Sequence, residues 1–303
     1  MELLTIFTPT YNRAYILPKL YESLKIQTDK RFEWVIVDDG SVDNTMSLVS
    51  FWQEEGLVNI NYKKQANQGK HIAINTGLEL AKGELFFIVD SDDCLTSDAV
   101  QKIFIFWNTH EHHDNISGIL SYRQFPDGTR VGYPLPKEVK QCKLRDSNKK
   151  YGSTGDKVVI YRTELFRNFK FPKFKEERFL GESYAYNQID DIADMLVMDD
   201  MIYIFDYQKD GLSQDFRKLY RENPIGFQAL FLQEEKYCTT WKSKIKNKIH
   251  ICCLAVKNHN ILKFIHRYGM SFLLLFPLGY ILYLKIFVMK SSDVKPYIEK
   301  SSK

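Results

Sequence analysis

Three carboxylates stand within four residues at positions 90–93, in the sequence D-S-D-D. They follow the apolar run 85–89, which has the composition of a buried strand. Side chains at the carboxyl end of such a strand lie where open α/β sheets bind their ligands. Carboxylates this close repel one another unless a cation or hydrogen bonds compensate them, and their hard oxygens suit Mg²⁺ or Mn²⁺. The cluster therefore indicates a metal ion that holds a diphosphate.

Three further turns carry polar residues that could bind a nucleotide. The turns are T-P-T-Y-N-R at 8–13, V-D-D-G-S at 37–41 and N-Q-G-K at 67–70. An aspartate in the second could accept a base N–H or bind a ribose hydroxyl, or it could form an Asx turn in which Gly40 supplies a positive φ. In the third, Gly69 would allow close approach of a ligand and Lys70 could reach a phosphate, although a plain helix start has the same pattern. The sequence contains neither G-x-G-x-x-G nor G-x-x-x-x-G-K-[ST], which removes the main support for dinucleotide and P-loop proteins.

Alternating strand-like and helix-like runs must position these turns. We expect strands at 3–8, 32–38, 58–63 and 85–90, and helices at 17–27, 45–54, 71–81 and 97–107, the last capped by Ser97. Strands are also expected within 116–125, 158–161 and 201–207. Repeated strand–helix units predict an α/β fold: a Rossmann-like, mostly parallel sheet with helices on both faces.

In this order, the motifs resemble those of the family 2 glycosyltransferases, which are inverting enzymes with the GT-A fold. The resemblance rests on the turns above, on V-D-D-G-S-V-D-N-T at 37–45, and on the spaced residues from Asn67 to Glu84 that end in A-K-G-E. It is strong over residues 1–95 and looser over 150–215. It implies transfer of a hexose from a nucleoside diphosphate sugar, with a UDP sugar as the first expectation, and Mn²⁺ or Mg²⁺ as the cofactor.

The resemblance also implies roles for residues that match the family motifs. Pro9 and Tyr11 would line the base pocket, and Asp39 would contact uracil or ribose. Asp90 is the first acid of the D-x-D element, and Lys70 completes the expected donor-binding set. Asp92 would be the main metal ligand, and Asp93 would support it.

An inverting enzyme needs a general base that deprotonates the acceptor hydroxyl. Family members often carry an E-D pair at a helix start for this purpose, and this chain has G-E-S at 181–183 instead. Glu182 is our expected base. The pair Asp190 and Asp191 is the rival, and a solvated helix face is the structural alternative for that pair.

The C-terminal part differs from the rest in charge. From Lys236 onward there are thirteen Lys or Arg and two acids, a net charge of +11, whereas residues 1–235 carry −7. Residues 270–284 form an apolar run, interrupted by Pro277 and Gly279, that is shorter than the roughly 18–20 residues of a comfortable membrane span. We expect an interfacial helix on the inner leaflet and no nucleic-acid partner; a helix packed on protein is the alternative. Five cysteines without a C-x-x-C pair fit a reducing compartment.

These observations predict two domains. Residues 1–220 would form the GT-A domain, with a nucleotide-sugar half (1–95) and an acceptor half (96–220), and 221–303 a basic, helical, membrane-associating region. The expected protein is a glycosyltransferase on the cytoplasmic side of the cell membrane, acting on a glycan or lipid-linked oligosaccharide in surface polysaccharide synthesis. Two alternatives remain: a catalytically inactive glycan-binding or scaffolding protein on the same fold, and a nucleotidyltransferase.

Overall fold

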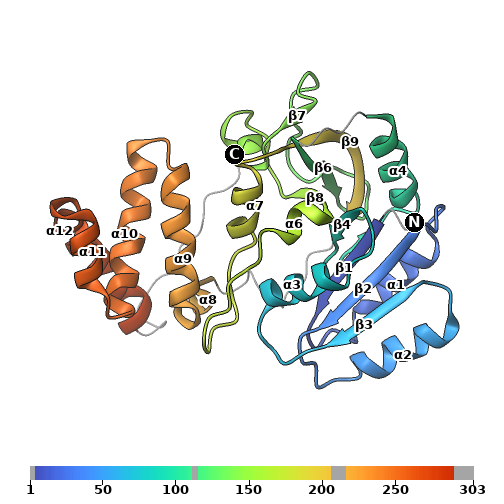
Figure 1. Cartoon of the computed structure of the whole chain (residues 1–303), viewed down its shortest axis with the longest axis horizontal. Helices are drawn as coiled ribbons and strands as arrows, with labels where there is room; N and C mark the ends of the chain where they lie inside the picture. The colour runs from blue at the N-terminus through green and yellow to red at the C-terminus, as the bar shows by residue number, and fades with distance from the viewer. Residues whose placement is uncertain (1–3, 111–114, 206–215, 290–303) are drawn as a thin grey trace. The chain divides into compact units, whose positions relative to one another are not determined.

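The computed structural model describes residues 4–110, 115–205 and 216–289, which belong to two compact units (Figure 1). The first unit takes in Met1–Lys173 and Glu182–Gly211, and the second takes in Phe174–Gly181 and Leu212–Lys303. The division differs from a single boundary at residue 220, because the short segment before Glu182 belongs with the C-terminal helices.

The first unit begins with alternating strands and helices that build the parallel part of its sheet. In chain order these are β1 (Leu4–Thr10), α1 (Leu17–Lys25), β2 (Phe32–Asp38), α2 (Thr45–Glu55), β3 (Ile60–Lys64), α3 (Lys70–Leu80) and β4 (Leu85–Ile88). The four strands lie in the order β3-β2-β1-β4, all parallel, so their carboxyl ends share one edge. The predicted Rossmann-like arrangement is confirmed here.

The remaining strands extend the sheet and make it mixed. The elements are β5 (Cys94–Leu95), α4 (Ala99–Thr109), β6 (Ile116–Gln124), β7 (Gln141–Cys142), α5 (Leu144–Lys149), β8 (Lys157–Arg162), α6 (Thr163–Arg167), α7 (Ser183–Ile189) and β9 (Asp194–Ile204). The order continues from β4 through β8, β6 and β9 to β5, and β7 pairs with β9. β8 is antiparallel to β4 and β6, whereas β9 runs parallel to β6.

Helices cover both faces of the parallel part. Buried residues of α1, α2 and α4 join one hydrophobic cluster with Ile6, Trp34 and Ile36. The next residues along β1 point the other way, and there α3 contacts Phe7 through Gly77. This is the alternation that a strand covered on both sides requires.

Gly77→Ala should destabilise the protein, although alanine favours helices over glycine. A Cβ at position 77 would lie 2.3 Å from Cε2 of Phe7, whose ring is buried and stacked on Phe86. Overpacking of this kind costs about 1–3 kcal/mol, against a propensity gain of about 1 kcal/mol. Chemical denaturation of the purified variant measures the balance, and an increased free energy of unfolding would contradict this close contact.

Two sequence predictions are corrected by the structure. The last strand begins at Asp194, seven residues before the predicted start at 201, and its later part, 206–207, lies outside the described residues. Asp199 and Asp200 interrupt the apolar pattern in the middle of this strand, so its first half is not recognisable from the sequence. The residue before α4 is Asp98 rather than Ser97, and it makes no side-chain cap hydrogen bond.

The second unit is helical over the residues that the structure describes. Its helices are α8 (Phe216–Glu222), α9 (Pro224–Glu234), α10 (Trp241–Lys257), α11 (Ile261–Tyr268) and α12 (Met270–Tyr283), with a π-helical turn at Leu284–Val288. The carboxylate of Glu177 accepts hydrogen bonds from the amides of Ile225 and Gly226, both at 2.7 Å, at the start of α9. This contact explains why the segment 174–181 belongs to the helical unit.

The helix at Met270–Val288 is longer than the sequence predicted. It continues through Pro277 for 19 residues with a mean hydropathy of 2.0, so its length and composition would allow a membrane crossing, and 11% of that window is buried. The inference that the run is too short to cross is therefore wrong. One face of α12 packs on α10, since a Cβ at Gly279 would lie 2.3 Å from the Cβ of Cys252. The residues of the opposite face are exposed.

Candidate active site at the carboxyl ends of the parallel strands

The acidic loop follows β4 and is fixed by backbone bonds. The amide of Val89 donates to the carbonyl of Phe7 at 2.9 Å, and the amide of Asp93 donates to the carbonyl of Asp90 at 3.2 Å, closing a turn. The loop therefore begins at the sheet edge where β1, β2 and β4 all end. This is the position that the sequence predicted.

Asp93 is directed into the protein. Its side chain is 4% exposed, and the hydroxyl of Tyr203 on β9 donates to its Oδ2 at 2.6 Å while accepting from the amide of Asp90 at 3.1 Å. Burial raises the pKa of Asp93 to about 7, partly offset by the Tyr203 hydrogen bond. The guanidinium of Arg123 on β6 lies 3.9 Å away and 4.6 Å from the Tyr203 ring. Asp93, expected to support the metal, thus has its carboxylate engaged inside the protein.

The environment of Asp92 disfavours the negative charge of its carboxylate. It is half-buried, and burial followed by the charge of Asp90 raises its pKa. No three His, Cys, Asp or Glu side chains form a metal cage anywhere in the described chain. Mg²⁺, however, is usually held by one or two carboxylates while substrate phosphates and waters complete its shell. The pair Asp90 and Asp92 fits that donor set.

Lys70, the first residue of α3, joins the two halves of the site. Its Nζ lies 2.6 Å from Oδ1 of Asp90 and 2.7 Å from Oε1 of Glu182. Burial alone would lower the pKa of Lys70, but the two carboxylates raise it well above its usual value. Burial alone would raise the pKa of Asp90, but the ammonium of Lys70 lowers it, and the net shift is downward. The cluster is a charged triad at the strand ends.

Glu182 stands immediately before α7. Its main-chain carbonyl accepts from the amides of Ala185 and Tyr186, and the Tyr186 hydroxyl donates to Oε2 at 3.2 Å. Its Oε1 contacts Lys70, which also contacts Asp90 of the acidic loop, and about a third of the Glu182 side chain is exposed.

The rival acids have structural partners elsewhere. Asp190 is 1% exposed, and its two oxygens accept from the amides of Leu144 and Arg145 at 2.9 and 2.8 Å, at the start of α5. Asp191 forms an ion pair with the Arg145 side chain at 2.9 Å. Both acids bind residues at the start of α5, whereas Glu182 is the acid that lies near the acidic loop through Lys70.

Asp39 organises the turn that leads into α3. Its oxygens accept from the side chain of Gln65 at 2.8 Å and from the amides of Gln68 and Gly69 at 2.9 and 2.7 Å. Gly69 has φ 92, a backbone conformation that favours glycine. The carboxylate therefore shapes the loop that carries Lys70, and its contact with uracil or ribose stays a prediction.

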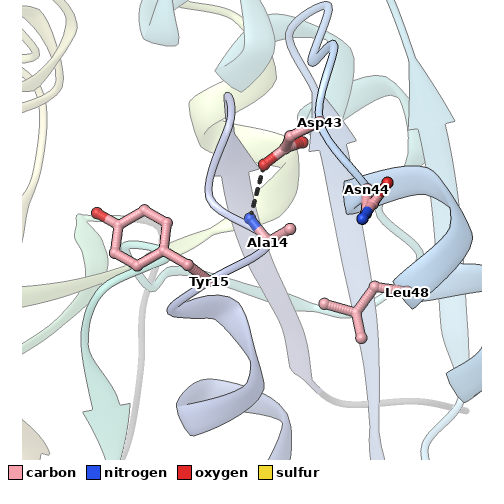
Figure 2. Close-up of a pocket in the computed structure, with 5 residues that line it drawn as sticks. All are labelled: Ala14, Tyr15, Asp43, Asn44 and Leu48. Carbon is pink, nitrogen blue, oxygen red and sulfur yellow. Dashed lines mark hydrogen bonds between the residues drawn. The ribbon is translucent and has the colours of Figure 1, made fainter.

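The other expected base contacts lie on the turn after β1. Pro9 is half-buried and Tyr11 is 45% exposed, which leaves its ring available to a flat ligand. A hollow of about 520 Å³ opens beside this turn, lined by Ala14, Tyr15, Asp43, Asn44 and Leu48 (Figure 2). Asp43 accepts from the amide of Ala14 at 3.0 Å there. None of the expected donor-binding residues lines this hollow.

Sequence reasoning missed three residues that surround the acids: Arg123, Tyr186 and Tyr203. Each is a single polar or aromatic residue within a strand or helix, and no local motif sets it apart. The first seven residues of β6 are all buried, and a charged residue directly after such a stretch, as Arg123 is, could have suggested a partner.

The model of the family described as glycosyl transferase family 2 matches residues 5–176, more than half of the chain. The chain therefore belongs to this family.

Relatives match a part of the chain. An uncharacterised glycosyltransferase of Nostoc sp. is 32% identical over 125 residues, covering 41% of this chain and 38% of the relative. A PGL/p-HBAD biosynthesis glycosyltransferase of Mycobacterium bovis is 31% identical over 120 residues, covering 39% and 47%. The match thus spans less than half the length of these curated relatives.

Solved structures share the fold. The structure of S. aureus TarS in complex with UDP-GlcNAc has a TM-score of 0.58 at 20% identity, covering 83% of this chain and 81% of that one. The mannosyltransferase PcManGT of Pyrobaculum calidifontis, in complex with GDP-Man and Mn²⁺, has a TM-score of 0.53 at 17% identity, covering 93% and 80%. At these identities the likeness confirms the GT-A type of α/β fold and nothing finer.

Proposed function

We propose that this chain is an inverting glycosyltransferase that moves a hexose from a nucleoside diphosphate sugar to a hydroxyl of a glycan. The observation that carries the proposal is the pair of ion contacts from Lys70, which brings Asp90 of the acidic loop and Glu182 to one place in a family 2 chain. Donor-binding and proton-accepting groups must meet in this way if a single-displacement reaction is to occur.

The chemistry assigned to the chain's own residues is simple. Glu182 accepts the proton of the acceptor hydroxyl as its oxygen attacks the anomeric carbon, and the bond from that carbon to the diphosphate oxygen breaks. Attack opposite to the leaving group inverts the anomeric configuration. Pro9, Tyr11 and Asp39 hold the nucleoside, while Lys70 and Asp90 lie at the diphosphate.

Asp92, with Asp90, would hold Mn²⁺ or Mg²⁺. A bound ion of this kind neutralises charge that develops on the leaving diphosphate. Asp93 serves in this proposal to keep the loop in shape through Tyr203, in place of the metal-binding role first expected for it.

A donor screen tests the function. Purified full-length protein, Mn²⁺ and a panel of UDP, GDP and ADP sugars are incubated with and without glycan acceptors, and the released nucleoside diphosphate is measured. We expect a UDP sugar to be turned over, in keeping with the UDP-GlcNAc complex of the structural neighbour TarS. Binding of glycans without turnover of any donor would favour the inactive glycan-binding protein, and pyrophosphate release from a nucleoside triphosphate would favour a nucleotidyltransferase.

We further propose that the second unit lies on the inner leaflet and that the acceptor is a lipid-linked oligosaccharide of a surface polysaccharide. The outward face of α12 is apolar: Leu274 is 73% exposed, and Leu278 and Ile281 are each 49% exposed. Lys263 on α11 and Lys285 after α12 are also exposed and would favour anionic headgroups. Since the opposite face of α12 packs on α10, a helix lying in the interface fits better than a crossing.

Vesicle flotation tests this membrane contact. Full-length protein should float with vesicles that contain anionic phosphatidylglycerol and should remain at the bottom with neutral vesicles at moderate salt. The double substitution Leu274→Glu with Ile281→Glu should reduce the bound fraction at least about tenfold, because two exposed apolar side chains that would enter the membrane interface are replaced by charges.

Ile105→Glu is the matched control for that experiment. Ile105 is 58% exposed on α4, in the first unit, so the same chemical change there should leave flotation unaltered. Full-length protein that stays at the bottom with anionic vesicles would remove the membrane proposal, and the exposed face of α12 would then fit contact with protein.

A further inference from the structure

Lys70 lies between the acidic loop and Glu182, the expected base. Its ammonium contacts Asp90 and Glu182 at 2.6 and 2.7 Å, and these three residues come from the start of α3, the loop after β4 and the start of α7. The side chains are 27%, 31% and 32% exposed, so water and a ligand can reach the cluster. The ammonium of Lys70 thus contacts two carboxylates, and the charges of Arg123 and Arg13 also act on Asp90.

This contact conflicts with the task assigned to Glu182. A carboxylate oxygen held at 2.7 Å by an ammonium is not available to an acceptor hydroxyl at the same time. The other oxygen receives the Tyr186 hydroxyl at 3.2 Å. Both oxygens of the expected base are therefore engaged.

The donor supplies a competitor for the same ammonium. A diphosphate carries more negative charge than a carboxylate, and lysine binds phosphates as a point charge on a flexible stem. Asp90 already places Lys70 beside the acidic loop at which the diphosphate is expected. A small swing of the side chain would exchange Glu182 for a phosphate oxygen.

We propose that Lys70 is a positioning residue that holds the carboxylate of Glu182 engaged and releases it when the donor diphosphate takes over the ammonium. This inference rests on the proposed function. It predicts that donor binding precedes productive acceptor binding, and that the base becomes available only after the leaving group is in place.

Carboxyl labelling with a carbodiimide and an amine, read by peptide mass spectrometry, tests the release without an acceptor. UDP with Mn²⁺ should raise the labelling rate of Glu182 in the wild-type protein at least about threefold, because an ammonium contact is lost. Asp191, paired with Arg145, is the internal reference and should not change. In Lys70→Met the labelling of Glu182 should be high with and without UDP, and Lys70→Arg should restore the dependence on UDP.

The affinity for UDP provides the second measurement. Loss of a charge-assisted contact should weaken UDP binding by about 10- to 100-fold in Lys70→Met and much less in Lys70→Arg. Lys170→Met is the matched control, since Lys170 forms an exposed ion pair with Glu79 at 2.9 Å, and its binding and labelling should match wild type.

The outcomes distinguish the proposed release of Glu182 from the proposed glycosyltransferase function. If wild-type protein binds UDP but the labelling of Glu182 does not rise, the release mechanism is wrong and the glycosyltransferase proposal stands. If no nucleoside diphosphate from a panel of UDP, GDP and ADP binds, the function itself fails and the release mechanism fails with it. If Lys70→Met does not fold, the wild-type comparison with and without UDP still decides.

Discussion

Asp92→Asn should lower the rate of sugar transfer by about 10²-fold or more. The substitution removes one negative charge while nearly preserving shape, so its effect reports the interaction of Asp92 with the ion. Stabilisation of a leaving group by a metal is worth several kcal/mol, which corresponds to at least two powers of ten in rate. Wild-type turnover should likewise vanish in EDTA and return when Mn²⁺ is added.

Asp98→Asn provides the control for that charge change. Asp98 precedes α4 and forms an ion pair with Lys102 at 2.9 Å, close in sequence to the acidic loop but with partners of its own. Its neutralisation should leave turnover within about twofold, as is usual for exposed ion pairs. Full activity of the wild-type enzyme in chelator would exclude a metal-dependent mechanism.

Glu182→Gln should slow transfer by about 10²–10⁴-fold while donor affinity stays close to that of wild type. Glutamine can still accept a hydrogen bond from Lys70 or Tyr186 but has no basicity to remove a proton from the acceptor. Initial rates at saturating donor, together with UDP titrations, separate the two effects.

Asp190→Asn and Asp191→Asn complete the comparison. Because Asp190 binds two amides at the start of α5, its substitution should lower thermal stability more than it lowers the rate per folded molecule. Asp191→Asn should be nearly neutral. A benign Glu182→Gln beside a crippled, folded Asp191→Asn or Asp190→Asn would transfer the role of general base to the rival pair.

The parallel half of the sheet could be predicted from sequence because its signals are local. The strand predicted at 32–38 is observed as Phe32–Asp38, and all seven of its residues are buried, in keeping with a run that is apolar apart from Glu33 and Asp38. The acidic loop and the turn before Lys70 could be recognised for the same reason: each is contiguous and follows a strand. Parallel order then brings their ends together.

Contacts between distant segments could not be predicted in this way. The approach of Glu182 to Lys70 depends on how β8 and α6 return the chain to the sheet, and no short motif encodes that path. The partnership of Tyr203 with Asp93 similarly depends on the parallel pairing of β9 with β6, which follows a long and irregular connection. The apolar run predicted at 270–284 ends before Lys285, whereas the helical segment continues past this lysine to Val288.

The hydrogen bonds of Tyr203 have a consequence for grafting acceptor loops between relatives. β9 lies in the second half of the sheet, yet the hydroxyl of Tyr203 accepts from the Asp90 amide and donates to Asp93, so this strand supports the acidic loop. A chimaera that imports the connection between β6 and β8 can alter specificity while keeping the acidic loop in place. A chimaera that also replaces β9 must retain a hydroxyl-bearing aromatic residue at position 203. Without it, we expect the acidic loop to be displaced.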